Sequence, residues 1–295
     1  AHRASGGHLN INRAARISKL QKQAYTGTAI LRPGVLIMNR CALAKSMAVL
    51  LIAFSSWTAK AQDLVLNTAL TISSPTTYDN VTIQSGGILT ANAPITVNGS
   101  LTIQSGGIVT HSLRLEAGLV LDVAGVLDVQ AGGLIDLNAK GLRGGRNGSI
   151  YGATGEAYND EGQIVAGAQS GNDYGGAGAS YGGTGANSNT GSQTNAAYGL
   201  LDAPLWLGSG GGCSIYGGTG GHGGGRGTIA AGTLIVNGTI RANGQNGTGT
   251  AYLGGGGSGG SLYLQAGSLS GSGAVQAIGG QSPNRYPGAG GGGRI

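Results

Sequence analysis

The sequence predicts an all-β protein, a solenoid of short strands stacked coil on coil that carries a long glycine-rich insertion. The first observation is a repeated phrase at residues 81–87 (VTIQSGG) and 101–107 (LTIQSGG), an offset of 20 residues. β-Branched residues alternate with polar ones and a glycine pair ends the run, which is typical of a repeat of stacked strands. The offset places Ile83 over Ile103, so that each coil buries its apolar face against the next.

A second pair of matched units indicates the same architecture near the C-terminus. Residues 229–244 and 264–279 match at an offset of 35, and a glycine run introduces each of them. The first phrase also returns at 129–134, 26 residues after its second copy, so the coil length varies. After residue 61 the chain has no Phe and a single Trp, Trp206, so we expect an interior of Ile, Leu and Val ladders.

We expect strands throughout residues 62–140, each ending at Gly, Asn-Gly or Ser. The expected strands are 64–66, 70–72, 81–83, 95–97, 101–103, 113–115, 119–123, 127–129 and 134–137. Glycine is too frequent and apolar spacing too strand-like for a helix after residue 61. Residues 228–295 are expected to return to the same coils. Their last glycine run, 290–293, reads as the start of a further unit, so we expect the chain to be truncated there.

Residues 141–227 form a glycine-rich, low-complexity insertion in which Tyr, Ser, Asn and Thr accompany glycine. Such a tract has little to bury and loses much backbone entropy on ordering, so flexible loops are the expectation. The alternative is a bundle of extended polyglycine helices packed on the solenoid. Leu200, Leu201 and residues 205–207 are the clearest apolar anchors in the tract.

Residues 38–61 have the organisation of a secretory signal peptide, which we expect to be helical. A basic segment starts at Met38, an apolar run covers 47–54, and a small-x-small motif at 59–61 predicts cleavage between Ala61 and Gln62. The apolar run is much shorter than the roughly 20 residues of a membrane span. We therefore expect a secreted or outer-surface protein whose mature chain has no transmembrane span. Residues 1–37 contain no Met and are interpreted as an upstream, non-native leader, with a transit peptide as the alternative.

The positive charge of the chain does not indicate a nucleic-acid partner. Residues 1–61 hold nine of the 17 Lys and Arg and none of the 11 Asp and Glu. From Gln62 onward eight basic residues stand against 11 acidic ones, a net charge of −3. The part of the chain that folds is mildly acidic, so we expect no nucleic-acid binding.

These features together resemble the secreted, glycine-rich right-handed parallel β-helix proteins of bacterial surfaces, of the adhesin and autotransporter-passenger type. The resemblance rests on the phrases at 82–87 and 102–107 and on the glycine-run units at 223–244 and 256–279. It covers most of residues 62–295. It implies a right-handed parallel β-helix that acts as a stalk, an adhesive passenger or a matrix component.

Three carboxylates are the candidates for a metal site. Asp122, Asp128 and Asp136 each stand between apolar neighbours on expected strands, so their side chains are predicted to point outward. We interpret them as a solvated face. The alternative is a Ca²⁺ site, as in a polysaccharide lyase in which a neighbouring Arg or Lys removes the proton. Calcium is therefore the one cofactor that the sequence suggests, and none is expected under the main interpretation.

No other residues converge on a catalytic set. His111, His222 and Cys213 lack partners at the spacing of a zinc site or a nucleophile pair. Residues 218–223 match G-x-G-x-x-G but lead into an expected strand, whereas a dinucleotide loop opens a helix.

Two further patterns concern binding. The 20-residue offset stacks Thr82 on Thr102 and Thr90 on Thr110, a small threonine ladder of the kind that could bind ice, and Asp128 interrupts it. The tyrosines of the glycine-rich tract and Trp206 could stack on glycans, although we expect them mainly to pin the tract in place. The aromatic residues concerned are Tyr151, Tyr158, Tyr174, Tyr181, Tyr198, Tyr216 and Trp206.

We therefore predict a secreted or cell-surface structural or adhesive protein without catalytic activity. Extracellular glycans or matrix are its expected partners. The alternatives are a Ca²⁺-dependent polysaccharide lyase or hydrolase on the same fold and an ice-binding solenoid.

Overall fold

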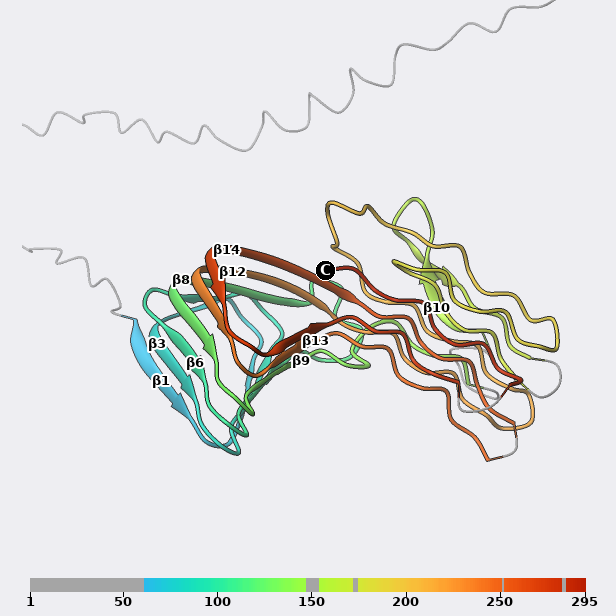
Figure 1. Cartoon of the computed structure of the whole chain (residues 1–295), viewed down its shortest axis with the longest axis horizontal. Coiled ribbons are helices and arrows are strands. Elements are labelled where there is room, and N and C mark those ends of the chain that lie inside the picture. The colour runs from blue at the N-terminus through green and yellow to red at the C-terminus, as the bar shows by residue number, and fades with distance from the viewer. Residues whose placement is uncertain (1–60, 147–153, 172–174, 251, 283–284) are drawn as a thin grey trace, which may run out of the picture. The chain divides into compact units, whose positions relative to one another are not determined.

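The computed structural model describes residues 61–146, 154–171, 175–250, 252–282 and 285–295, and these residues are all-β (Figure 1). No helix occurs among them. Two sheets contain only parallel pairs, and a separate two-stranded sheet is antiparallel. The described residues contain no helix that is long and apolar enough to cross a bilayer.

The first sheet has seven strands and the second has six. The strands of the first sheet are β1 (Gln62–Leu66), β3 (Thr76–Ile83), β5 (Ile95–Val97), β6 (Leu101–Ile103), β8 (Leu119–Val129), β12 (Arg226–Val236) and β14 (Ser261–Ser270). The strands of the second sheet are β2 (Ala69–Ile72), β4 (Ile88–Ala91), β7 (Ile108–Thr110), β9 (Leu134–Asp136), β13 (Thr239–Arg241) and β15 (Ala274–Gln276). The antiparallel pair is β10 (Glu156–Tyr158) with β11 (Ile164–Ala166).

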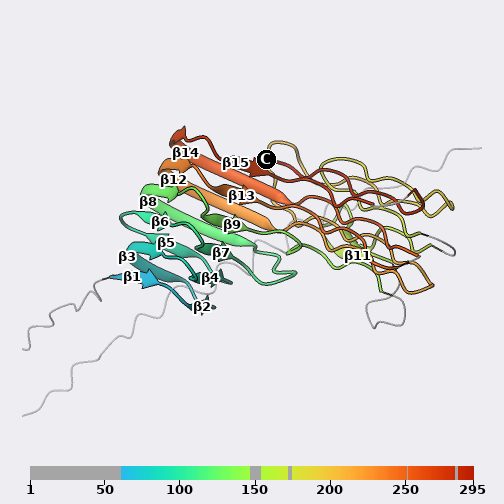
Figure 2. The ribbon, with the colours of Figure 1, turned by 60° about the horizontal axis from the view of Figure 1, so that its bottom comes forward.

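The chain alternates between the two parallel sheets. Each pass adds a strand to the first sheet and then one to the second, and Figure 2 shows the strands of the first sheet succeeding one another from β1 to β14. β5 and β6 count as one interrupted strand, since both lie between β3 and β8. Neighbours in each sheet are therefore separated in sequence by one complete pass.

The apolar ladders run along the sheets in the register that the repeats predict. Ile83 pairs with Ile103, and Ile103 pairs with Val129. Ile229 pairs with Leu264 at the predicted offset of 35. Ile83, Ile103 and Val129 are fully buried in one core cluster to which both sheets contribute. Each such side chain contributes roughly 1.5–3 kcal/mol on burial, which makes these ladders the main source of stability in the paired strands.

The glycine pair of the repeated phrase has two separate structural roles. Gly106 has a φ of +78°, which L side chains rarely adopt, so the first glycine permits the turn. A Cβ on the next residue, Gly107, would lie 2.6 Å from the carbonyl oxygen of Ile83 in the preceding pass. The second glycine therefore permits close stacking of one pass on the next.

Several details differ from the sequence-based expectations. Residues 113–115 form no strand, because Arg114 adopts a φ of +60° and the chain turns there. The expected strands 119–123 and 127–129 are one strand, β8, and the expectations omitted β4 and β7. The predicted signal peptide, its helix and the leader lie outside the described residues, apart from Ala61.

The glycine-rich tract is where the expectation of flexible loops is wrong. Its described segments, within 141–225, 244–260 and 279–293, run alongside one another and exchange backbone hydrogen bonds; we call them the glycine bundle. The bonds of residues 255–260 have a period of three: 255 and 258 donate to 209–212, 256 and 259 to 288–291, and 257 and 260 to 242–245. An extended helix with three residues per turn has this periodicity. Neighbouring segments satisfy the backbone groups, so side chains are not needed to order the tract.

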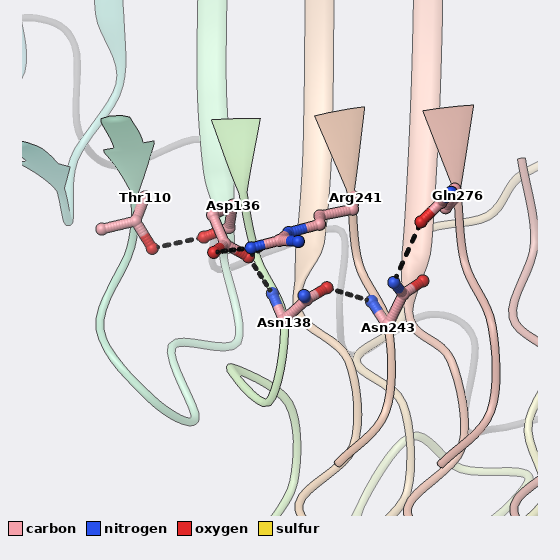
Figure 3. Close-up of polar contacts among 6 residues, drawn as sticks. All are labelled: Thr110, Asp136, Asn138, Arg241, Asn243 and Gln276. Atoms are coloured by element: carbon pink, nitrogen blue, oxygen red, sulfur yellow. Dashed lines mark hydrogen bonds and ion pairs between the residues drawn. The ribbon is translucent and has the colours of Figure 1, made fainter. Parts of the chain in front are cut away.

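Polar side chains link successive passes at the end of the second sheet (Figure 3). The Oδ1 atom of Asn138 accepts the Asn243 N–H at 2.8 Å, and the Oδ1 atom of Asn243 accepts the Ile278 N–H at 2.8 Å. The Asn243 amide also donates to the Oε1 atom of Gln276 at 3.3 Å. These bonds satisfy backbone N–H groups where the strands have ended.

Replacing Asn243 with alanine is expected to lower the free energy of unfolding by about 1–2 kcal/mol, because the half-buried side chain loses its hydrogen bonds to the Ile278 N–H and to Gln276. Asn246 is the matched control, since its Oδ1 atom accepts the Gln281 N–H at 2.7 Å but the side chain is exposed. Water can replace that acceptor, so we expect Asn246→Ala to cost less than about 0.5 kcal/mol. Urea denaturation of both variants measures the difference, and equal costs would contradict a role for burial.

Candidate ligand-binding cleft

An aromatic cluster forms where the β10–β11 pair meets the glycine bundle. Tyr158 at the end of β10 packs edge-on against Tyr198, with ring centroids 5.6 Å apart. Tyr198 also contacts Tyr181 at 4.9 Å, and Trp206 lies 4.7 Å from Tyr158. The three tyrosines are buried, whereas Trp206 is half-buried at the edge of the cluster. The indole therefore joins the cluster to the surface.

Two hollows adjoin at Trp206, and we call them together the Trp206 cleft. One, of about 420 Å³, is lined by Glu116, Tyr158, Leu200, Ala203, Leu205, Trp206 and Arg226. The other, of about 500 Å³, is lined by Asn159, Asp160, Ala197, Tyr198, Gly199, Leu200 and Trp206. Leu200 and Trp206 belong to both. The cleft thus combines an aromatic centre with carboxylate, amide and guanidinium groups, the mixture typical of small-molecule sites.

Two glycines with positive φ leave room for the indole. A Cβ on Gly162, where φ is +75°, would lie 2.6 Å from Cη2 of Trp206. A Cβ on Gly199, where φ is +77°, would lie 2.8 Å from Cδ1 at the other end of the ring system. A side chain at either position would displace Trp206, so the turns at these glycines determine where the indole lies.

The tyrosine hydroxyls in the cluster act as hydrogen-bonding groups rather than as bases. The Tyr198 hydroxyl donates to the Leu207 carbonyl at 2.6 Å and accepts from the Ser209 hydroxyl at 2.9 Å. Burial raises the pKa of Tyr198 well above its ordinary value and raises the pKa of Tyr158 as well. Both phenols therefore stay protonated at any physiological pH.

Arg226 lies in the wall of the cleft with part of its guanidinium unsatisfied. Its Nη1 atom donates to the Glu116 carbonyl at 3.2 Å, and its buried Nε atom has no hydrogen-bond partner among the described residues. Burial lowers its pKa. A buried N–H group without an acceptor is costly, and a bound polar group that accepts from Nε would reduce that cost.

The leucines that the sequence indicates as anchors have different positions. Leu207 is fully buried beside the tyrosines, as expected. Leu200 and Leu201, however, are 66% and 82% exposed, so they do not anchor the tract. Leu200 instead extends the apolar surface of the cleft into solvent.

The structure does not bring the three candidate metal ligands together. Asp122 and Asp128 lie on β8 in the first sheet, whereas Asp136 lies on β9 in the second. Both carboxylate oxygens of Asp136 are bonded by Arg241, with Oδ1 3.1 Å from Nε and Oδ2 2.8 Å from Nη2 (Figure 3). No group of three His, Cys, Asp or Glu side chains within the described ranges is placed to hold a metal ion.

The histidines and the cysteine have structural surroundings. His111 is fully buried, and its Nε2 atom accepts the Arg226 N–H at 3.3 Å. His222 accepts the Gly144 N–H at 2.9 Å through Nδ1, and Cys213 is buried in the glycine bundle. Residues 218–223, the G-x-G-x-x-G match, lead into β12 and not into a helix. A dinucleotide loop is therefore excluded at this position.

The threonine ladder has the predicted register, but it is interrupted in both parallel sheets. Thr82 pairs with Thr102 and Thr90 with Thr110, and Asp128 takes the next place after Thr102. The Thr110 hydroxyl is buried and donates to the Asp136 carbonyl at 2.6 Å. Asp128 and the buried Thr110 hydroxyl therefore interrupt the rows of threonine hydroxyls.

The remaining aromatic candidates lie elsewhere or outside the described ranges. Tyr216 is exposed and stacks on Tyr252 with ring centroids 4.9 Å apart. Tyr151 and Tyr174 lie outside the described residues. Among the sequence candidates, Trp206, Tyr158 and Tyr198 are therefore the ones that form the Trp206 cleft.

Sequence reasoning missed Glu116, Asp160 and Arg226 as residues of this cleft, because they belong to distant segments and no local pattern marks them.

Comparison of the chain with protein families, with curated proteins and with solved structures found no match. The fold and the Trp206 cleft are therefore the basis for assigning a function. Together they define a class, an all-β protein with parallel sheets whose glycine bundle presents an aromatic cleft.

Proposed function

We propose that this chain is a secreted or surface-displayed adhesive protein that binds a saccharide in the Trp206 cleft and does not alter it chemically. The cleft is the observation that carries the proposal. A half-exposed indole offers a flat apolar face for a sugar ring, and the groups around it offer hydrogen bonds to hydroxyls. The polar groups in question are those of Glu116, Asn159, Asp160 and Arg226.

The scaffold is proposed to be a right-handed parallel β-helix. Its support is the regular alternation of strands between two parallel sheets, with paired residues separated by 16–26 positions before the glycine-rich tract, by 105–108 across it and by 35 after it. Crossover connections between parallel strands are right-handed in nearly all proteins, which gives the hand. A ladder-stabilised rod of this kind suits a stalk that presents the glycine bundle at a distance from a surface.

Secretion is proposed from the predicted signal peptide. The support from the fold is that β1 begins at Gln62, the residue after the predicted cleavage site. Cleavage there would leave all the described strands of the first sheet in the mature chain. No catalytic step is assigned, because the carboxylates that the sequence suggested, the described histidines and Cys213 lie in the separate surroundings given above.

The test uses the full chain expressed in a bacterial host, with the exported form purified and applied to an array of neutral and acidic glycans. We expect saturable binding that Trp206→Ala weakens more than about tenfold, since buried aromatic contacts dominate binding energy. Trp206→Phe keeps the packing on Tyr158 and is expected to lose less. Tyr216→Ala, at an exposed aromatic outside the cleft, is the matched control and should bind as the unaltered chain does.

Three outcomes would contradict the proposal. Equal binding by the Trp206→Ala and Tyr216→Ala variants would remove the cleft from the binding site. A chain retained wholly in the cytosol would remove the proposed location. Product release from pectin or alginate that needs Ca²⁺ and is abolished by Asp128→Ala would favour the lyase alternative.

A further inference from the structure

A second cleft, of about 440 Å³, lies at the edge of the glycine bundle and is not used by the proposed function. Its lining includes Arg143, Arg146 and His222, together with Gln245, Thr219 and Thr248. No acidic residue is among the described residues of its lining. We call it the cationic cleft.

The imidazole of His222 presents a donor to its surroundings. Gly144 donates its N–H to Nδ1 at 2.9 Å, so Nδ1 carries no proton and the neutral ring must carry its proton on Nε2. Burial and the neighbouring Arg143 lower the pKa of His222, which agrees with a neutral ring. The acceptor nitrogen is thus already bonded within the protein, and the remaining ring nitrogen is a donor.

Gln245, like His222, has its acceptor atom bonded within the protein. The His222 N–H donates to its Oε1 atom at 3.2 Å, and an N–H donor requires that this atom is the amide oxygen. The remaining end of the side chain is the NH₂ group. The hydroxyls of Thr219 and Thr248 share a hydrogen bond with each other. Two polar residues of the lining therefore direct their acceptors inward to the protein.

The charge of the cleft is positive because two arginines line it, and the one carboxylate that acts on His222, Glu156, is paired with arginines. Both oxygens of Glu156 are bonded by Nε of Arg114, at 3.0 and 2.8 Å, and Oε2 also accepts the Arg143 backbone N–H at 2.9 Å. The guanidinium of Arg143 forms a longer ion pair with Glu156, at 4.0 Å. Glu156 supplies a single negative charge to Arg114 and Arg143, and Arg146 adds a further positive charge, so the balance around the cleft is positive.

We propose that the cationic cleft binds a tetrahedral oxyanion, the sulfate or phosphate group of a small molecule. Guanidinium, imidazole and amide donors on different walls of one cleft match a group with three or more acceptor oxygens. The volume leaves room for the sugar or other group that bears the anion. This site is independent of the Trp206 cleft, so either proposal can fail without the other.

The experiment titrates the intact chain at constant ionic strength with glucose 6-sulfate, glucose 6-phosphate and glucose, and follows the His222 ring resonances by NMR. We expect saturable shifts with one or both anionic sugars and none with glucose. Arg146→Gln, at an exposed position that should not affect folding, is expected to weaken binding about tenfold. Arg285→Gln removes the same charge from an exposed position outside the cleft and is the matched control.

The two anionic sugars in the titration also distinguish a sulfated ligand from a phosphorylated one. Binding of the sulfate ester alone would assign sulfated glycans, and binding of the phosphate ester alone would assign phosphorylated ones. Equal shifts with glucose would overturn the proposal. Equal losses in the Arg146→Gln and Arg285→Gln variants would also overturn it, because they would show diffuse attraction to the whole surface.

Discussion

Gly255→Ala is expected to disrupt the glycine bundle, with a loss of at least about 3 kcal/mol in the free energy of unfolding. A Cβ at this position would overlap the carbonyl oxygen and carbon of Ala177. Gly255 also donates its N–H to Gly212 at 2.8 Å and accepts the Gly221 N–H at 2.9 Å, so it cannot move without breaking these bonds. Backbone atoms surround the site, and no flexible side chain can give way. Urea denaturation followed by Trp206 fluorescence measures the loss.

Gly292→Ala is the matched control within another glycine run of the bundle. The nearest atom to a Cβ there is the Ala277 carbonyl oxygen, at 3.9 Å, an ordinary van der Waals distance. Its backbone has no positive φ that would strain an alanine. We therefore expect a change within about 0.5 kcal/mol. Similar losses for the two variants would show that glycine acts through backbone entropy and not through close packing.

The paired strands were predictable because stacking makes the sequence repeat. A residue such as Ile83 meets its counterpart Ile103 in the next pass, so the same environment selects the same residue type at each offset. The alternation of apolar and polar residues then predicts that the segment is a strand and which of its side chains point into the core. Residues 113–115 have the same alternation but lie where the chain turns toward Lys140, whose carbonyl accepts the Arg114 N–H at 2.9 Å. Tertiary contacts override local pattern there.

The order of the glycine bundle was not predictable by the same reasoning. Each segment is held by hydrogen bonds to segments far away in the sequence, as Gly255 is by Gly212 and Gly221. The segments can pack closely because glycine has no side chain, but a flexible low-complexity linker has the same glycine-rich composition. Only the pattern of backbone hydrogen bonds in the folded chain distinguishes the ordered glycine bundle from a flexible linker.

The Trp206 cleft could be predicted only in part, because some of its residues come from segments far apart in the sequence. Trp206 stands out in the sequence as the sole Trp after residue 61, and the tyrosines around it are frequent in the tract. Glu116 and Arg226 reach the cleft from the ends of unrelated segments, one in the turn before β8 and one at the start of β12. No pattern in a single stretch of sequence can join positions that only the fold brings together.

The chain is expected to lose about 2–3 kcal/mol of stability as the pH falls from 7 to 4.5, mainly through His111. Burial, together with the charge of Lys140, lowers the pKa of this imidazole from 6.5 to about 4. Its Nδ1–H donates to the Ser112 carbonyl at 2.8 Å and its Nε2 accepts the Arg226 N–H at 3.3 Å, so a second ring proton would oppose that N–H. The folded state therefore disfavours the imidazolium.

The direction of the pH effect on stability follows from whether the folded or the unfolded chain takes up the proton. Between pH 6.5 and 4 the imidazole of the unfolded chain is protonated while that of the folded chain stays neutral, so acid favours unfolding, and the loss levels off below pH 4. Burial lowers the pKa of His222 as well, which adds a loss in the same direction. Urea denaturation at intervals from pH 7 to 4.5 measures the slope in the unaltered chain, in His111→Gln and in His222→Gln. His111→Gln should be less stable at pH 7 yet have the flatter profile, and an unchanged slope in that variant would assign the acid sensitivity to other groups.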